Sequence, residues 1–578
     1  MKKIIIATVS FILVSTICFF SWRDYQNKLA GPNTLKLALD NLVENLDPAI
    51  AYSDDALVLS AQVLEPLYQY HYLKRPFEIE PLLASGLPSI SSDGKTYRIK
   101  IRPNVFYHPH SCLKPGRMVE VKDIINQFKR VAFNPLKSPG KSLFSNVIKG
   151  YQDFSIKVGE NFSKLKSESI PGLYAEGDEL VIELVNPEPN LIYYLSLNFI
   201  VPIPEELMEC LKNKLSDVLV GTGPYQYAGF KENKYYDLIK NPDYRLEFYP
   251  SVGDRFANVQ NLLDSSKQRI PFLPEVHFYV LPGEKERWDQ FIEEDLDIVT
   301  VPKSYIPLLF NEKGELSKDL ADKNFQIQHF PILANRWLGF NMKHPIVGKN
   351  PYLRKAIAYG INYQEYLRIM SQNTNLRANS LLVPGIWGYH PTQKLRYDYR
   401  PDLAHEYLKM GGFEKNTDRP KLVYSTRGNQ EIHLIEANFI KDELAKIGLE
   451  VEIEILTFSE FLSKGRAGEL MFFTDNWLFD YPDGENILQL LYSRHFPGVN
   501  KSAYSNSEVD ALYLKLKDRP SLDEKDHLMQ KIEDIVMEDL PWIPLMYESS
   551  FVLNRPGIKN YRKSTLIRNY VKYLKYED

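Results

Sequence analysis

The residues with the greatest potential for chemistry lie in one short segment, Trp477-Leu478-Phe479-Asp480-Tyr481-Pro482-Asp483. Two carboxylates can cooperate in glycoside hydrolysis, where one is protonated and the other is ionised. That reaction requires the two carboxyl groups to lie about 5 to 10 Å apart across a sugar bond. Two side chains three positions apart around Pro482 seldom meet this condition, so a hydrolase that uses Asp480 and Asp483 is only an alternative.

Other catalytic and metal-binding patterns are incomplete. His405-Glu406 lacks the second His of a zinc-protease helix, because Lys409 stands at that position. The segment His108-Pro109-His110-Ser111-Cys112 contains metal-binding residue types, but zinc ligands usually come in separated pairs. Gly221-Thr222-Gly223 is followed by Gln226 where a dinucleotide loop needs its last Gly. We therefore expect no catalytic residue, no metal and no cofactor.

The spacing of apolar residues predicts the elements that must position these side chains. Residues 96–101 alternate polar and apolar types, and the turn signal Ser91-Ser92-Asp93-Gly94 precedes them, so a β-hairpin is expected there. Apolar residues three and four positions apart predict helices over 121–131 and 431–447. The second helix ends at a glycine and leads into an alternating strand over 451–456, which is an α/β unit.

Composition narrows the class of protein. With 578 residues, of which 44% are apolar and 25% charged, the chain has the make-up of a soluble globular protein. At roughly 150 residues per domain, the length predicts three or four compact units. Lys and Arg total 70 against 74 Asp and Glu, so the charge gives no reason to expect nucleic acid binding. Cys112 and Cys210 are able to pair in an oxidising compartment, but the sequence does not decide whether they do.

Residues 1–30 have the pattern of an export signal. Lys2-Lys3 precede an apolar run from Ile4 to Phe20, as in a secretion signal. The run is also near the minimum length that spans a bilayer, so an uncleaved amino-terminal anchor is equally compatible with it. We expect export to the periplasm, with or without a tether to the inner membrane.

Short motifs follow one another in a fixed order along most of the chain. They are Leu46-Asp47-Pro48, Leu64-Glu65-Pro66-Leu67, Ile79-Glu80-Pro81-Leu82-Leu83-Ala84, Ser92-Asp93-Gly94-Lys95-Thr96-Tyr97, Ile101-Arg102-Pro103-Asn104-Val105, Val119-Glu120-Val121-Lys122-Asp123, Gly221-Thr222-Gly223-Pro224-Tyr225, Leu338-Gly339-Phe340-Asn341, Arg354-Lys355-Ala356-Ile357, the segment 477–483 and Leu540-Pro541-Trp542-Ile543-Pro544-Leu545. In this order they resemble the extracytoplasmic solute-binding proteins of oligopeptide and dipeptide ABC transporters, bacterial solute-binding family 5. The resemblance implies an α/β, two-lobed periplasmic-binding-protein-like fold of type II, with an extra subdomain in the first lobe.

The same resemblance implies where each unit begins and ends. The first lobe is expected to comprise residues 31–69, 190–331 and 547–578. The inserted subdomain is expected at 70–189, and the second lobe at 332–546.

The resemblance also implies a set of ligand-binding residues. Asp480 occupies the position at which family members supply a carboxylate to the ammonium group of a peptide. A buried ammonium needs such a partner, because leaving it unpaired costs a great deal of free energy. Trp477 and Tyr481 are expected to form flat walls beside it, and Tyr52 and Ser53 to line the first-lobe side of the cleft.

One departure limits the resemblance. Several oligopeptide binders have an Arg where this chain has Thr474, so capture of the peptide's carboxyl end is not carried over. The expected function is a monomeric receptor that captures di- to oligopeptides between its lobes and delivers them to an ABC transporter permease in the inner membrane. A modified peptide, a metal complex, haem or a sugar as ligand, and a membrane-tethered sensor, are alternatives.

Overall fold

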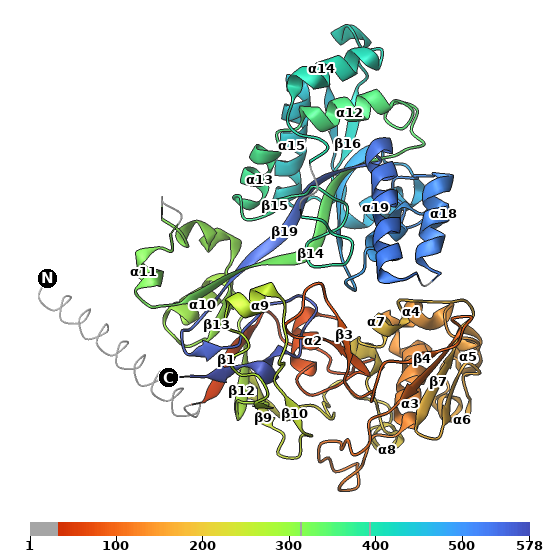
Figure 1. Cartoon of the computed structure of the whole chain (residues 1–578), viewed down its shortest axis with the longest axis vertical. Coiled ribbons are helices and arrows are strands. Elements are labelled where there is room, and N and C mark those ends of the chain that lie inside the picture. The colour runs from red at the N-terminus through yellow and green to blue at the C-terminus, as the bar shows by residue number, and fades with distance from the viewer. Residues whose placement is uncertain (1–32, 312–314, 392–394, 519, 578) are drawn as a thin grey trace, which may run out of the picture.

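Two long antiparallel strands run through both lobes of the protein, β14 (Gln326–Phe340) and β19 (Trp542–Asn554). The computed structural model describes residues 33–577 apart from 312–314, 392–394 and 519. The pairing of β14 with β19 shifts register between Pro331 and Asn335, at the level where one lobe gives way to the other. The strands therefore form the connection about which the two lobes are arranged (Figure 1).

The second lobe is an α/β layer built on the upper part of a seven-stranded sheet of order β13-β19-β14-β18-β16-β17, in which β15 pairs with β19. Its further strands are β15 (Leu376–Arg377), β16 (Leu422–Ser425), β17 (Val451–Glu454) and β18 (Phe472–Leu478). Its main helices are α12 (Pro351–Gly360), α13 (Tyr363–Ser371), α14 (Pro401–Met410), α15 (Glu431–Lys446), α16 (Phe458–Ala467), α17 (Glu485–Leu488), α18 (Ser507–Leu516) and α19 (Leu522–Asp539). Strands β16, β17 and β18 run parallel, so the loops after them lie at one edge of the sheet.

The first lobe contains a four-stranded sheet of order β1-β12-β9-β8. Its strands are β1 (Thr34–Leu39), β8 (Tyr225–Lys231), β9 (Tyr235–Lys240) and β12 (Glu275–Val280), and β13 (Ile298–Thr300) joins the seven-stranded sheet from this side. The beginning and the end of the described chain meet here, because the Tyr576 hydroxyl donates a hydrogen bond to Asp297 (2.6 Å) and its oxygen also lies 3.1 Å from the Thr34 carbonyl oxygen.

A subdomain with its own sheet, of order β4-β5-β7-β6, packs beside the first lobe (Figure 1). Its elements are β4 (Ser89–Ile90), β5 (Thr96–Lys100), β6 (Leu173–Glu176), β7 (Glu179–Glu183), α3 (Val121–Ala132), α4 (Ser142–Ser145), α5 (Tyr151–Val158), α6 (Phe162–Ser167), and then α7 (Leu191–Tyr194) and α8 (Glu205–Cys210). The predicted hairpin is confirmed by the antiparallel pair β4 and β5. The two predicted helices are α3 and α15, and β17 follows α15 as expected.

A buried ion pair joins the subdomain to the first lobe. Arg130 on α3 is fully buried, and its guanidinium donates two hydrogen bonds to the carboxylate of Asp47, at 2.9 and 2.5 Å. Asp47 belongs to the loop between β1 and α2 (Asp54–Ser60). Because both charges are removed from water, each depends on the other for compensation.

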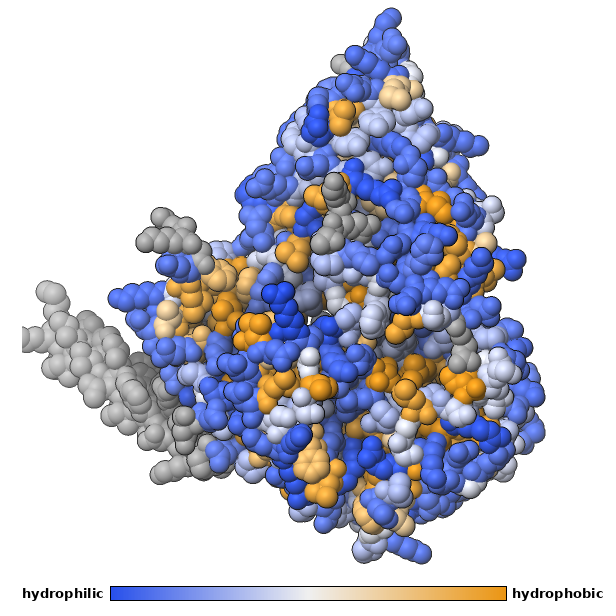
Figure 2. Space-filling model, in the orientation of Figure 1, coloured by the Kyte–Doolittle hydropathy of each residue, from blue (hydrophilic) through white to orange (hydrophobic). Residues whose placement is uncertain are grey.

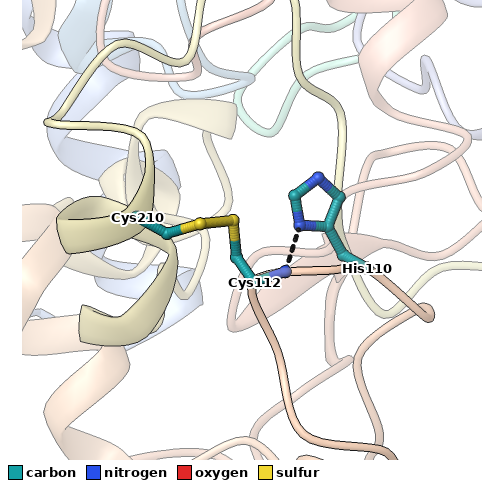
Figure 3. Close-up of a disulfide and its surroundings, with 3 residues drawn as sticks. All are labelled: His110, Cys112 and Cys210. Carbon is teal, nitrogen blue, oxygen red and sulfur yellow. Dashed lines mark hydrogen bonds between the residues drawn. A yellow bond between two sulfur atoms is a disulfide. The ribbon is translucent and has the colours of Figure 1, made fainter.

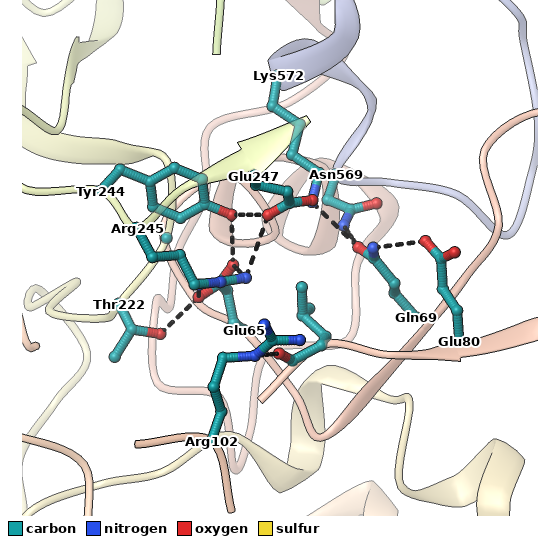
Figure 4. A network of polar contacts seen from close by, with 12 residues as sticks. Glu65, Gln69, Glu80, Arg102, Thr222, Tyr244, Arg245, Glu247, Asn569 and Lys572 are labelled. Carbon is teal, nitrogen blue, oxygen red and sulfur yellow. Dashed lines mark hydrogen bonds and ion pairs between the residues drawn. The ribbon is translucent and has the colours of Figure 1, made fainter. Parts of the chain in front are cut away.

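The core of the first lobe contains a second polar network (Figure 4). Glu65 accepts two hydrogen bonds from Arg245 (2.6 and 2.8 Å) and one from the Thr222 hydroxyl (2.8 Å). Lys572, near the end of the chain, pairs with Glu247 at 2.7 Å. The network therefore joins three segments that are far apart in the sequence.

Gly221 and Gly223 flank Thr222 for a steric reason. A Cβ at Gly221 would lie 2.1 Å from the Val63 carbonyl oxygen, and one at Gly223 would lie 2.7 Å from the same atom. Only glycine allows this close approach of two backbones. This motif is architectural and forms no dinucleotide loop.

Cys112 and Cys210 form a disulfide that connects the loop after β5 to the end of α8 (Figure 3). His110 accepts a hydrogen bond from the Cys112 backbone N–H at 3.2 Å, and the Nε2 atom of His108 lies 2.9 Å from the Gly223 carbonyl oxygen. Because Cys112 is in a disulfide, the His108–Cys112 segment lacks a thiolate for a metal.

Among the described residues, no helix combines the length and the apolar character that a bilayer crossing requires. The predicted export signal, residues 1–30, lies outside the described part of the chain. Figure 2 shows a polar surface on which the two lobes meet at a hollowed waist.

Candidate functional site

Asp480 lies in the loop that leaves β18 and leads into α17, at the edge of the second lobe. The side-chain oxygen of Asn486 accepts hydrogen bonds from the Trp477 indole N–H (2.7 Å) and from the Asp480 backbone N–H (3.2 Å). The Asn486 amide N–H group is 3.4 Å from an Asp480 carboxylate oxygen. The Phe479 backbone N–H donates to the Leu333 carbonyl at 2.9 Å. The loop is therefore fixed to the long strand β14, and Asn486 orients both Trp477 and Asp480.

The carboxylate of Asp480 has no cation within ion-pair distance among the described residues. Its side chain is exposed. Even so, the surrounding protein raises the pKa of Asp480 above 3.8 by limiting its hydration, and the hydrogen bond from Asn486 opposes this only in part. An exposed carboxylate with restricted hydration and no counter-charge is an acceptor ready for a cationic group.

Tyr481 extends from the same loop to the other side of the waist. Its ring stacks on Tyr193, with centroids 5.4 Å apart and planes inclined by 8°, and meets the edge of Tyr194 at 5.7 Å. Both partners belong to α7, next to the subdomain sheet. Tyr481 is 5% exposed, so it is an interlobe packing residue with little free surface.

Hydrogen bonds and ion pairs beside Tyr481 also join the second lobe to residues 188–190. Glu485 accepts hydrogen bonds from Tyr481 (2.7 Å) in its own lobe and from Asn190 (2.8 Å) across the waist. Lys517, after α18, lies 2.9 Å from Glu188 and 3.5 Å from Glu485. One ammonium thus bridges a carboxylate from each side. We refer to these polar residues and the three tyrosines as the interlobe seam.

A pocket of about 830 Å³ opens beside the interlobe seam. Its walls come from the subdomain and from the second lobe, and include Tyr194, Tyr481, Glu485, His495 and Tyr513. Asp480 and Trp477 do not line it. The pocket has the size of a small-molecule site and combines aromatic faces with a few charges.

The two predicted residues of the first-lobe wall have different surroundings. Tyr52 is 62% exposed, and its ring stacks on Phe199 with centroids 6.0 Å apart. Ser53 is the N-cap of α2, and its hydroxyl accepts the Ala56 backbone N–H at 3.3 Å. No contact within the described residues joins either of them to Asp480. The structure therefore brings Trp477, Asp480 and Tyr481 together and leaves Tyr52 and Ser53 apart from them.

Asp483 is buried, whereas Asp480 is exposed. Asp483 is 3% exposed, forms an ion pair with Lys525 and accepts the Glu485 backbone N–H at 2.9 Å. A carboxylate held in this way cannot act on a sugar bond together with Asp480. The hydrolase alternative therefore loses its second acidic group.

Thr474, on β18, contacts a buried ion pair. Its hydroxyl donates to Glu436 (2.7 Å), which also accepts two hydrogen bonds from Arg336 (2.8 and 2.6 Å). The Arg336 pair holds the pKa of Glu436 below its usual value, although burial acts in the other direction. The Thr474 hydroxyl is therefore hydrogen-bonded within the core, and position 474 provides no cation for a ligand.

Three residues of the first lobe have the types and spacing of a metal site. The Nε2 atom of His277 is 3.1 Å from a Glu275 oxygen and 3.8 Å from an Asp237 oxygen, and the three donor atoms lie within 4.8 Å of one another. His277 and Asp237 are direct neighbours across β12 and β9. These strands contribute nothing to the interlobe seam.

Asn486, Glu485, Glu188 and Lys517 were not identified from the sequence. Asn486 and Glu485 are polar residues at the start of an otherwise apolar helix. This local pattern indicates that their side chains are buried and hydrogen-bonded. Lys517 and Glu188 carry no such signal, because their meeting depends on how the lobes are arranged.

Comparison with known proteins agrees with this architecture. Residues 78–496 match the family described as bacterial extracellular solute-binding proteins, family 5 Middle. A probable di/tripeptide-binding protein 5 of Pseudomonas aeruginosa is 21% identical over 486 residues, covering 82% of this chain and 83% of its own. Heme-binding protein A of Haemophilus influenzae is 23% identical over 515 residues, covering 87% and 85%. The unliganded open form of MppA, a periplasmic murein tripeptide-binding protein, superposes with a TM-score of 0.75 at 18% identity, covering 95% of this chain and 98% of its own. The chain belongs to family 5 of the bacterial extracellular solute-binding proteins.

Proposed function

We propose that this protein is the receptor of an ABC transporter that captures short peptides between its lobes and delivers them to a permease. The observation that carries the proposal is Asp480, an uncompensated carboxylate at the lobe boundary whose orientation is set by Asn486. The ammonium group of a peptide supplies the missing charge. The name of the relative from Pseudomonas aeruginosa agrees with this ligand class.

Capture follows from the two-lobed shape. A peptide that contacts both lobes stabilises the arrangement in which they are close, by the difference in its affinity for the two arrangements. The backbone of an extended peptide offers donors and acceptors that bind without reading side chains. In this proposal the second lobe begins near residue 332 and ends near 546, within β14 and β19, and the protein acts as an exported monomer in the periplasm.

The test is a titration of the mature protein with a mixed pool of di- to pentapeptides, followed by intrinsic tryptophan fluorescence, for which Trp477 is the local reporter. Asp480→Asn should weaken binding by about 10- to 150-fold, since a charge-assisted hydrogen bond contributes roughly 1.5 to 3 kcal/mol. Asp178→Asn, at an exposed ion pair on the subdomain, is the matched control and should bind as the wild type does. A wild-type protein that gives no saturable response to any pool would contradict the proposal.

Haem is the second candidate ligand, because the 830 Å³ pocket contains His495 and four tyrosines. The Nδ1 atom of His495 is 2.7 Å from the Gln489 carbonyl, which leaves Nε2 for a metal. A relative named heme-binding protein A supports this alternative. Titration with hemin should then give a saturable Soret shift that His495→Ala abolishes, whereas a peptide receptor gives none.

A further inference from the structure

Asp237, Glu275 and His277 lie on β9 and β12, which are adjacent strands of the first-lobe sheet (Figure 1). His277 pairs directly with Asp237 across the two strands, and Glu275 is two positions before His277 on β12. Side chains two positions apart in a strand point to the same face of a sheet. Strand pairing therefore brings together three residues of the types that bind divalent metals, and we refer to them as the sheet triad.

The donor atoms of the sheet triad have the separations of a tetrahedral metal site. The Nε2 atom of His277 is 3.1 Å from the Glu275 Oε1 atom and 3.8 Å from the Asp237 Oδ1 atom, and the three donor atoms lie within 4.8 Å of one another. Zinc binds imidazole nitrogen and carboxylate oxygen at about 2.0 Å in a tetrahedron, which places neighbouring ligand atoms about 3.3 Å apart. Small side-chain movements are therefore enough to bring the three atoms around one ion.

Two of the three side chains are buried and lack partners. Among the described residues, the Asp237 Oδ1 atom is inaccessible to solvent and accepts no hydrogen bond, although His277 Nε2 is its neighbour in the sheet triad. The His277 side chain is 2% exposed, and its Nδ1 atom also has no partner. A buried carboxylate oxygen without a donor costs free energy, and a cation between it and the imidazole removes that cost.

The charges of the sheet triad are unbalanced. In the described part of the chain, His277 is the only group at ion-pair distance from either carboxylate. Lys231 acts on Asp237 only from farther away. One imidazolium shared by two carboxylates leaves a negative charge uncompensated, whereas a divalent cation neutralises both carboxylates and binds neutral imidazole.

Neighbouring groups hold the sheet triad in place. The ring of Tyr235 stacks on that of His277, with centroids 4.2 Å apart and planes inclined by 29°. The Thr34 hydroxyl on β1 donates to the Oε2 atom of Glu275 at 2.9 Å, which leaves Oε1 for the ion. Ligands that are fixed by their surroundings need little rearrangement to bind a metal.

We propose that Asp237, Glu275 and His277 bind one zinc ion, through His277 Nε2 and one oxygen of each carboxylate, with water in the fourth position. Imidazole favours zinc over magnesium and calcium, which prefer oxygen ligands alone. The ion joins β9 to β12 and, through Thr34, to β1, so its effect is on the stability of the first lobe. The zinc site is separate from the interlobe seam and does not depend on the peptide-capture function proposed above.

The test is isothermal titration calorimetry with zinc chloride, on the mature protein without a histidine tag, after dialysis against EDTA and then against buffer. The wild type should bind one equivalent of zinc, about 100-fold more tightly than magnesium. Asp237→Asn and Glu275→Gln, which keep the side-chain shape, should each weaken zinc binding by about tenfold or more. His390→Gln, at the surface pair of His390 with Asp526, is the matched control and should bind zinc as the wild type does.

Thermal unfolding provides a second measurement. Zinc should raise the unfolding temperature of the wild type and of His390→Gln, because an ion that binds the folded state stabilises it. Asp237→Asn and Glu275→Gln should unfold cooperatively, which shows that they are folded, and should not respond to zinc. Glu275 is the most exposed of the three, at 30%, so its replacement disturbs the fold least.

Two results would overturn the zinc site. One is a wild type that binds no zinc or binds it no better than magnesium. The other is a pair of sheet-triad variants that keep the wild-type affinity and the zinc-dependent rise in unfolding temperature, because the ion must then lie elsewhere.

Discussion

The Cys112–Cys210 disulfide should supply a large part of the stability of the subdomain. It joins residues 98 positions apart and closes a loop that contains α3 to α8 with β6 and β7. In the chain-entropy treatment, a cross-link around a loop of this length removes about 4.7 kcal/mol of unfolded-state entropy at 25 °C. Cys210 is exposed and Cys112 is half-buried, so replacing them removes little packing.

The perturbation is the double variant Cys112→Ala/Cys210→Ala, compared with the wild type in urea unfolding followed by circular dichroism. With a urea dependence of about 2 to 3 kcal/mol per molar, the subdomain transition should move down by about 2 M. The wild type treated with a reducing agent should behave like the double variant, and the double variant should not respond to the reductant.

A double variant that unfolds at the wild-type urea concentration would refute this reasoning. The cross-link would then restrict no unfolded state, either because the thiols do not pair in the protein or because the loop they close is already constrained. Mass measurement after alkylation of free thiols separates these two explanations.

Three further predictions follow from the described contacts. Because burial raises the pKa of Asp480, and only the ionised form binds an ammonium, peptide affinity should start to fall on acidification at a higher pH than for an ordinary aspartate; fluorescence titrations between about pH 3.5 and 7.5 should show this, and Asp480→Asn should give a flat profile. Asp47→Asn should lower the free energy of unfolding by about 3 to 5 kcal/mol in urea, because Arg130 is left buried without its counter-charge, and the double variant with Arg130→Met should recover part of the loss. Asn486→Leu should weaken peptide binding by about tenfold with little change in the far-UV spectrum, because Trp477 and Asp480 lose their shared partner; unchanged affinity would show that Asn486 does not position them.

Local patterns in the sequence predicted local structure well. The apolar spacing of residues 431–447 predicts α15 because one face of that helix packs on the sheet, and the turn signal at 91–94 predicts the hairpin because it is a property of a few adjacent residues. The ordered motifs predicted the two-lobed fold, since several of them are structural joints. Asp47 pairs with Arg130, and Thr222 pairs with Glu65.

The contacts around the site were harder to predict from the sequence, because they join residues that are far apart in the chain. Whether Cys112 meets Cys210, or Lys517 meets Glu188, is decided by tertiary packing over 98 and 329 positions.

The contacts of Tyr576 with Thr34 and Asp297 determine how late in synthesis the first lobe can be completed. The first lobe is assembled from the earliest and the latest described residues, so its interior stays incomplete until synthesis has passed Lys572, whose ammonium pairs deep within it. A nascent chain therefore lacks a finished first lobe for most of its translation. The order of the segments therefore leaves the first lobe without its last partners until almost the whole chain has been made.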